Sequence, residues 1–150
     1  MSDPAPKITS NRVLIADDDP FVRSSLAAVL ESEGFVVDQA QNGIEAVTHA
    51  LAHTPDLALL DLNMPDWDGW RAFCQLDQIR PLLPVIIITA RPDQYPKAVE
   101  LGVDAFMEKP LNLPLLIEAI RQLTDKSRAY LARWAANRVP ATQLLSGPEY

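Results

Sequence analysis

The sequence has little cysteine, little positive charge and no long apolar run, and each shortage excludes a class of protein. A single cysteine, Cys74, allows no internal disulfide, so we expect a reducing, cytoplasmic location. Lysine and arginine total 13 against 20 aspartates and glutamates, and the net charge of -7 argues against direct binding to nucleic acid. No stretch reaches membrane-spanning length, and residues 1–10 lack the apolar run of a signal peptide.

The chain of 150 residues has the size and composition of one globular domain with a sizeable core. Hydrophobic residues make up 48% of it and charged residues 22%, with no repeat or low-complexity tract. We expect a disordered lead-in over residues 1–11 and a folded domain over residues 12–126. Residues 127–150 are predicted to form a C-terminal helical extension and tail, because neither Gly nor Pro interrupts residues 115–139.

The most informative stretch is residues 57–65, Leu-Ala-Leu-Leu-Asp-Leu-Asn-Met-Pro. Its first four apolar residues end on Asp61, and a turn sequence follows almost at once. A short apolar run bounded by turn residues predicts a strand buried on both faces of a parallel sheet. Such a strand brings its last side chain to the edge where open α/β folds bind ligands. Because a buried charge is costly unless it is balanced, Asp61 predicts a cation or a chemical task there.

Strands and helices are predicted to alternate along the chain. The predicted strands are residues 12–16, 35–40, 57–61, 85–89 and 105–108. Amphipathic segments lie between them, and the last helix begins near Leu113. This order predicts an α/β fold with a doubly wound, five-stranded parallel sheet and helices on both faces.

Polar residues stand where four of these strands end. Asp17 and Asp18 follow the first strand, Asp61 ends the third, Thr89 ends the fourth and Lys109 follows the fifth. Carboxylates gathered in one crevice raise one another's pKa unless a cation balances them, and oxygen ligands favour Mg²⁺. A lysine and a hydroxyl can contact phosphoryl oxygens, and an aspartate can itself attack phosphorus. The pattern therefore predicts phosphoryl chemistry with Mg²⁺.

The motifs at these positions resemble those of one family. They read Ile-Ala-Asp-Asp-Asp, Leu-Leu-Asp-Leu-Asn-Met-Pro-Asp-Trp-Asp-Gly, Ile-Ile-Ile-Thr-Ala and Gly-Val-Asp-Ala-Phe-Met-Glu-Lys-Pro, in this order. Together they resemble the receiver domain of bacterial two-component response regulators over residues 12–126. The resemblance implies a flavodoxin-like fold with strand order 2-1-3-4-5. It also implies phosphorylation by a sensor histidine kinase or phosphotransfer protein, and a switch in binding to a downstream protein partner.

The resemblance assigns roles residue by residue. Asp61 corresponds to the phosphoacceptor, which the family phosphorylates with its own catalysis and dephosphorylates slowly. Asp17 and Asp18 correspond to the acidic pair at Mg²⁺, together with the Asp61 carboxylate and the backbone carbonyl of Asn63. The residues that contact the phosphoryl group correspond to Thr89 and Lys109. Phe106 corresponds to the aromatic residue whose rotamer changes when the residue at the Thr89 position is drawn inward.

The sequence departs from the family pattern between Thr89 and Lys109. This segment is shorter than usual, and Pro92 and Pro96 fall where the fourth helix would begin, so we expect an unusual output face. Phe106 lacks the hydroxyl of the commoner Tyr. Arg91 adds a positive side chain near the phosphoryl entrance, which would change the lifetime of the phosphorylated state in either direction.

Two other interpretations fit the sequence less well. A Mg²⁺-dependent aspartyl-phosphate phosphohydrolase would need a second Asp two residues after the nucleophile as general acid, where this chain has Asn63. A degenerate receiver that serves only as a scaffold conflicts with the complete set of polar residues.

Three further features have simple structural interpretations. Asp19 is predicted to cap a helix that begins at Pro20. His49 and His53 are spaced one helical turn apart, but no neighbouring carboxylate or cysteine completes a metal site, so we expect a solvated surface. Aromatic residues among arginines in the predicted C-terminal helix suggest a contact surface, and a homodimer through that helix is possible.

Overall fold

The computed structural model describes residues 11–65, 67–125 and 142–146. All its strands pair in parallel in one sheet, with the order β2-β1-β3-β4-β5-β6. The strands are β1 (Arg12–Ala16), β2 (Val36–Ala40), β3 (Leu57–Asp61), β4 (Val85–Thr89), β5 (Ala105–Glu108) and β6 (Gln143–Leu144). The predicted parallel α/β fold and the order of its first five strands are confirmed.

The central strands consist of the apolar runs that the sequence indicates. Every residue of β3 and β4 is buried, because both faces of these strands are covered by helices. The register places Asp61 beside Ile88 and Thr89 beside Glu108, so the polar strand ends lie at one edge of the sheet.

The helices begin where short polar side chains accept hydrogen bonds from the first free N–H groups. Asp19, Asn42 and Asp68 cap α1, α2 and α3 in this way. The helices are α1 (Pro20–Ser32), α2 (Gly43–His53), α3 (Gly69–Ile79), α4 (Tyr95–Leu101) and α5 (Leu113–Asp125). Helix α4 has seven residues, and Gln94 before it makes no side-chain cap, which fits the prediction of a short helix beside Pro96.

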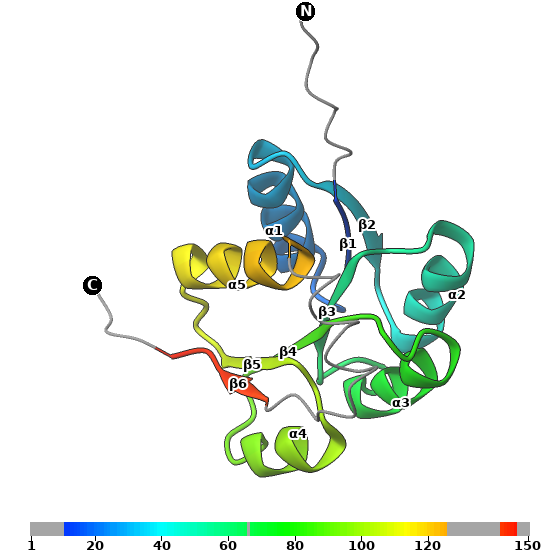
Figure 1. The fold of residues 1–150 in the computed structure, drawn as a ribbon, viewed down its shortest axis with the longest axis vertical. Helices are drawn as coiled ribbons and strands as arrows, with labels where there is room; N and C mark the ends of the chain where they lie inside the picture. Colours follow the sequence, from blue (N-terminus) through cyan, green and yellow to red (C-terminus); the bar gives the residue numbers. More distant parts are fainter. Residues whose placement is uncertain (1–10, 66, 126–141, 147–150) are drawn as a thin grey trace, which may run out of the picture.

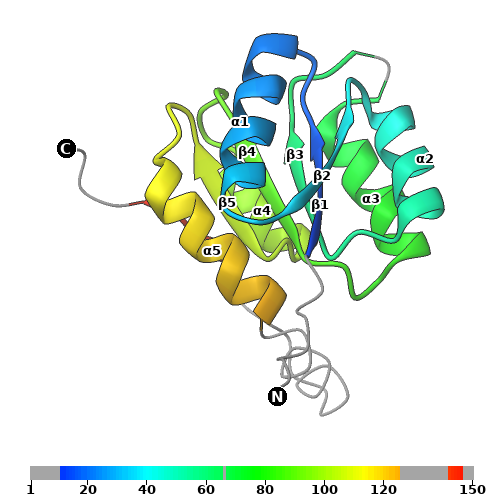
Figure 2. The same ribbon diagram turned by 90° about the horizontal axis from the view of Figure 1, so that it is seen from above.

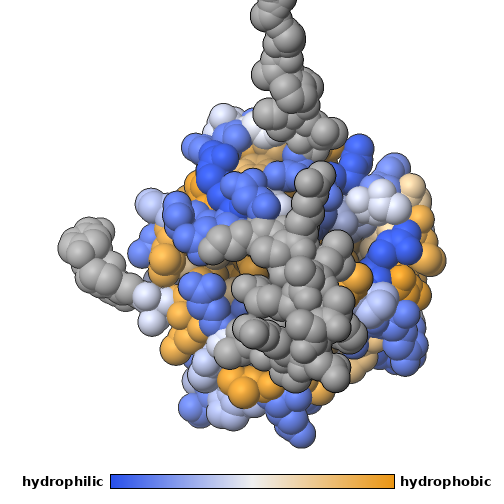
Figure 3. All heavy atoms as spheres, viewed as in Figure 1, coloured by the Kyte–Doolittle hydropathy of each residue, from blue (hydrophilic) through white to orange (hydrophobic). Residues whose placement is uncertain are grey.

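The helices form a layer on each face of the sheet (Figures 1 and 2). Helices α1 and α5 cover one face, where Leu30 and Ile120 join Ile15, Leu59 and Ile88 of the strands in one apolar cluster. Helices α2, α3 and α4 cover the other face, with a second cluster that includes Trp70, Phe73 and Phe106. Among the described residues, no helix is long and apolar enough to cross a membrane. Hydrophilic and hydrophobic residues are mixed over the coloured part of the face drawn in Figure 3.

One close approach fixes the loop after β3. A Cβ atom on Gly69 would lie 2.6 Å from the backbone oxygen of Asp61 and 2.7 Å from the Cα of Leu62. The N-terminus of α3 therefore rests directly on the backbone at the end of β3, and only glycine fits there.

A sixth strand corrects the prediction of a five-stranded sheet. The N–H of Gln143 donates to the carbonyl of Asp104 at 3.0 Å, and the N–H of Leu145 donates to the carbonyl of Phe106 at 2.7 Å. The Leu145 side chain is 4% exposed in the cluster under α1 and α5. Part of the predicted tail thus belongs to the sheet, because a two-residue strand can be recognised only from what it pairs with. Residues 126–141, where the rest of the helical extension was predicted, lie outside the described part.

Contacts between side chains and backbone anchor the new strand to α4. The hydroxyl of Tyr95 donates to the carbonyl of Thr142 at 3.2 Å, and the hydroxyl of Thr142 donates to the carbonyl of Ala98 at 3.3 Å. The ring of Tyr95 also lies 5.7 Å from that of Phe106, measured between centroids. The outer edge of β5 is therefore covered by backbone pairing, by a buried leucine and by a tyrosine from α4.

Candidate functional site

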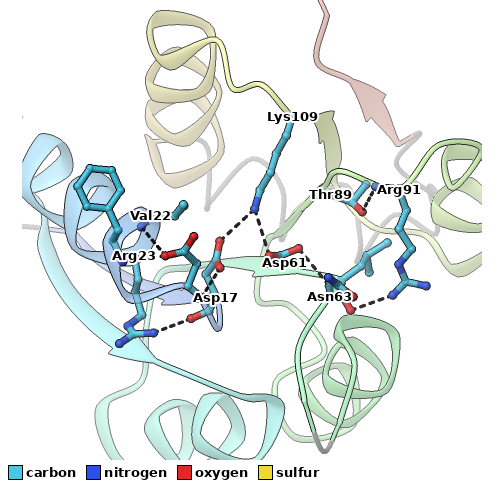
Figure 4. A network of polar contacts seen from close by, with 11 residues as sticks. Asp17, Val22, Arg23, Asp61, Asn63, Thr89, Arg91 and Lys109 are labelled. Atoms are coloured by element: carbon cyan, nitrogen blue, oxygen red, sulfur yellow. Dashed lines mark hydrogen bonds and ion pairs between the residues drawn. The ribbon is translucent and has the colours of Figure 1, made fainter.

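The carboxyl ends of four strands bring together the polar residues that the sequence singles out (Figure 4). Asp17 follows β1, Asp61 ends β3, Thr89 ends β4 and Lys109 follows β5. Asp17, Asp61 and Thr89 are buried, while Asp18 is exposed at the rim. The parallel sheet makes this convergence unavoidable, because all its strands end on the same side.

Lys109 is the cation at the centre of the site. Its Nζ lies 3.3 Å from Oδ2 of Asp17 and 3.2 Å from Oδ2 of Asp61. Burial lowers the pKa of Lys109, but the charges of Asp61 and Asp17 and the hydrogen bonds to both outweigh it, so the pKa is raised overall. Lys109 therefore stays charged and offsets part of the repulsion between the two carboxylates.

The carboxyl group of Asp17 has a raised pKa. Burial raises the pKa of its carboxyl, the backbone N–H of Asp19 lowers it by hydrogen bonding, and the charge of Asp61 raises it again. The Asp19 N–H donates to Oδ1 at 2.9 Å. Although the charge and hydrogen bond of Lys109 lower the pKa, the Asp17 carboxylate remains less favourable than in water.

Asp61 is held from two directions. Its Oδ1 accepts the backbone N–H of Asn63 at 3.1 Å and its Oδ2 accepts from Lys109. The side chain is 4% exposed. One oxygen is thereby fixed by the loop after β3 and the other faces the cation, which orients the carboxylate at the edge of the sheet.

The donor atoms at this edge fit a hard divalent cation. One carboxylate oxygen from each of Asp17, Asp18 and Asp61 lies within 4.8 Å of the others. Oxygen-only donors, part of them at the rim and open to water, suit Mg²⁺, which is usually held by one or two carboxylates and keeps several water ligands. Asn63, the fourth predicted ligand, is exposed in the adjoining loop.

Thr89 and Arg91 form a link that sequence reasoning described only in part. The hydroxyl oxygen of Thr89 accepts the backbone N–H of Arg91 at 2.9 Å. The Arg91 guanidinium donates to the carbonyl of Leu62 at 3.0 Å, while its Nε is buried without a partner among the described residues. Arg91 therefore joins the loop after β4 to the loop after β3.

Phe106 lies apart from the polar cluster, and Arg23 belongs to the site although the sequence did not indicate it. Phe106 is fully buried in β5 under α4, against Tyr95. Arg23, which the sequence did not single out, donates from its guanidinium to the backbone carbonyl of Asp17 at 2.7 Å. Its position one turn into α1 was the available indication, since that turn faces the end of β1.

Carboxylates that can hold a cation, with a lysine and a threonine beside them at the carboxyl edge of a doubly wound sheet, are typical of an α/β domain for phosphoryl chemistry. Comparison with known proteins gives the family. The family model for the response regulator receiver domain matches residues 13–121. The chain belongs to this family, and it is a phosphoacceptor domain of two-component signal transduction.

Individual relatives agree with this assignment. The chain is 34% identical over 113 residues to the chemotaxis protein CheY of Halobacterium salinarum, covering 74% of this chain and 94% of that protein. It is 36% identical over 124 residues to the transcriptional regulatory protein PdtaR of Mycobacterium tuberculosis, covering 81% of this chain but only 60% of PdtaR.

Solved structures give the same result. A CheY-like receiver domain protein from Methanospirillum hungatei superposes with a TM-score of 0.76 and 28% identity, covering 81% of this chain and 98% of that one. The response regulator TrrA of Thermotoga maritima, solved in complex with Mg²⁺ and BeF, has a TM-score of 0.70 and 28% identity, covering 75% of this chain and 98% of that one. The family binds Mg²⁺ in an acidic pocket, and this chain has an aspartate cluster at the matching edge of its sheet.

Proposed function

We propose that Asp61 is the residue that accepts the phosphoryl group. The observation that carries this proposal is the contact of 3.2 Å between Lys109 Nζ and the buried Oδ2 of Asp61 at the ligand-binding edge of the sheet. A carboxylate in this place is pre-oriented, and its added negative charge on phosphorylation meets a cation that is already present.

The transfer is a displacement at phosphorus. An Asp61 carboxylate oxygen attacks the phosphorus of a phosphohistidine on the histidine kinase or phosphotransfer protein. The new P–O bond forms as the P–N bond breaks, and the electron pair leaves with the imidazole nitrogen, which takes up a proton. In autodephosphorylation, a water oxygen attacks the same phosphorus, the bond to Asp61 breaks, and inorganic phosphate leaves. This catalysis serves the signalling switch, not metabolic turnover.

The surrounding residues take distinct parts in this proposal. The ammonium of Lys109 neutralises charge on the phosphoryl oxygens, and the hydroxyl of Thr89 donates to one of them. Asp17, Asp18 and Asp61, with the backbone carbonyl of Asn63, hold Mg²⁺. When bound, this ion supplies charge neutralisation on the phosphoryl oxygens.

The phosphorylated state is read out through Phe106. Thr89 is the last residue of β4, and Phe106 of β5 pairs with Ile87 of β4. An inward movement of Thr89 toward the phosphoryl group changes the space for the Phe106 ring, which packs on Tyr95. This chain of contacts supports a switch in binding to a downstream protein at the α4 and β5 side, in the cytoplasm. A homodimer through the predicted C-terminal helix remains a prediction, since it falls in residues 126–141.

The alternative of a phosphohydrolase is disfavoured at Asn63. The side-chain amide of Asn63 cannot supply the proton that a leaving group needs, and the hydrogen bond from Asn63 to Asp61 Oδ1 comes from the backbone N–H instead. A phosphohydrolase reaction at this site would therefore lack a general acid at position 63.

Acetyl phosphate with Mg²⁺ tests the assignment of Asp61. We expect one phosphoryl adduct per chain by intact-mass measurement, and none with Asp61→Asn. Asp68→Asn is the matched control, because Asn still caps α3 and the same loop is altered. An adduct that persists in Asp61→Asn, or is lost in Asp68→Asn alone, would show that another residue is the acceptor.

A further inference from the structure

We propose a second cation site, formed by Asp38, His49 and His53, that binds a borderline transition-metal ion such as Zn²⁺. One carboxylate oxygen of Asp38 and one ring nitrogen from each histidine lie within 4.8 Å of one another. The site shares no ligand with the aspartate cluster at the phosphorylation edge.

The fold supplies the ligand that the sequence lacked. His49 and His53 are one turn apart on α2, which buries Ala46 and Ala50 against the sheet. Asp38 lies on β2, the strand at the outer edge of the sheet beside α2. Residues 38 and 49 are separated in sequence by a turn and half a helix, so their proximity depends on how α2 packs.

The ligand set selects the kind of metal. Two imidazoles and one carboxylate, with remaining positions open to water, match zinc sites and are poor for Mg²⁺, which prefers oxygen. Ligands about 2.0 to 2.1 Å from a tetrahedral zinc lie about 3.3 Å apart. The ligand atoms now lie within 4.8 Å of one another, and side-chain rotation can bring them to the shorter distance. Such rotation is available because His53 is exposed and Asp38 and His49 are partly exposed.

Two contacts affect the affinity in opposite ways. Arg12 donates to both oxygens of Asp38, at 3.0 and 2.8 Å, which orients the carboxylate as a supporting group does in metal sites. The same guanidinium is a cation next to the proposed metal and repels it. The histidine rings stack with centroids 5.7 Å apart and an angle of 27°, so they must turn toward a common point. We therefore expect an affinity below that of closed structural zinc sites.

Binding would fasten the last turn of α2 to an edge strand. His53 is the last residue of this helix, and the helix ends at Thr54 in a left-handed conformation with φ 45°. A metal that binds only the folded state raises its stability by mass action, so the melting temperature should rise with added Zn²⁺.

The composition leaves few competing zinc ligands elsewhere in the chain. The chain has two histidines and one cysteine, so few other side chains can bind Zn²⁺ strongly. Zinc chloride is titrated by calorimetry into the full chain with saturating Mg²⁺, at about pH 7.5 because imidazoles must be deprotonated to bind metal. We expect one Zn²⁺ per chain, with the histidine ring signals in NMR spectra moving together.

Variants decide which residues bind. His53→Gln and Asp38→Asn should each weaken Zn²⁺ binding by at least the roughly 10- to 100-fold that loss of a supporting group costs. His53 is exposed, so His53→Gln keeps the proposal testable if Asp38→Asn unfolds. Cys74→Ser and Asp61→Asn are controls that should bind as the parent chain does.

Several outcomes would overturn the site. These are no binding to the parent chain, unchanged binding in His53→Gln or Asp38→Asn, or loss of binding in Asp61→Asn. None of these readouts uses phosphorylation, so failure of the zinc site and failure of the Asp61 assignment are separable.

Discussion

The central strands differ sharply between their bodies and their carboxyl ends. The bodies of β3 and β4 are apolar and fully enclosed, with side chains such as Leu60 and Ile87 at 0% exposed. Their ends carry Asp61 and Thr89, beside the buried carboxylate of Asp17. A few residues along one strand thus separate an environment that stabilises the fold from one that opposes it.

This difference shows how the domain holds a reactive site. Burial of the strand bodies contributes roughly 1.5 to 3 kcal/mol for each large side chain. The stability gained in the strand bodies allows Asp17 and Asp61 to lie close together around Lys109. Substitutions in the bodies should therefore lower stability, whereas substitutions at the ends should mainly change phosphorylation and the response to Mg²⁺.

The largest loss of stability is expected for Ile87→Ala. Ile87 is fully buried in β4, and removal of its larger side chain leaves a cavity, which should lower the free energy of unfolding by about 3 kcal/mol. Urea unfolding measures this. Ile44→Ala on the exposed side of α2 is the control and should change stability by less than about 0.5 kcal/mol. Equal effects of both substitutions would contradict the contrast.

A smaller loss is expected for Lys109→Ala. Asp17 and Asp61 lose their shared cation, which should lower the free energy of unfolding by about 2 kcal/mol without Mg²⁺. The folded pKa of Lys109 is raised above its ordinary 10.5, so this contribution is complete below pH 10.5 and is lost as pH rises through the folded value. Phosphorylation by acetyl phosphate should slow by about 100-fold.

Lys97→Ala on α4 is the control for this experiment. Lys97 is exposed, and its Nζ lies 5.4 Å from the centroid of the Trp70 ring, so we expect a change below about 1 kcal/mol. If Lys109→Ala were as stable as the parent chain at neutral pH, Lys109 would not compensate the carboxylates.

The smallest effect has the opposite sign and is expected for Asp17→Asn. The folded pKa of Asp17 is raised above its ordinary 3.8, so between these values the folded state holds more protons than the unfolded state. Stability therefore falls as pH rises from 3.8 through the folded value. Removal of the charge should stabilise the Mg²⁺-free protein by about 1 kcal/mol above that window, and not below pH 3.8. Thermal unfolding across pH tests this, and a gain that persists in acid would contradict it.

The strand bodies and ends could be predicted from the sequence for a local reason. A continuous apolar run indicates a buried strand, and its last residue marks the edge of a parallel sheet. Asp17, Asp61, Thr89 and Lys109 could therefore be grouped without knowledge of helix packing.

Features that depend on packing between distant elements could not be predicted in this way. Strand β6 has two residues and no periodicity, and only its hydrogen bonds to β5 define it. The proximity of Asp38 to His49 and His53 depends on the position of α2 over β2. The contact of Arg91 with the Leu62 carbonyl joins two loops whose paths no local pattern describes.

Strand β6 also bears on how the protein behaves at high concentration. An open strand edge offers unpaired N–H and C=O groups to other chains and is a common start of aggregation. At β5 these groups are taken by Gln143 and Leu145, so the border of the sheet passes to β6, and an edge strand of two residues offers little backbone for another chain to pair with. On the opposite side, β2 carries Asp38 with its partner Arg12, and charged side chains on an edge strand discourage the same pairing. The two borders of the sheet are thus protected against fibre-like assembly by different means, one by the shortness of its edge strand and one by charge.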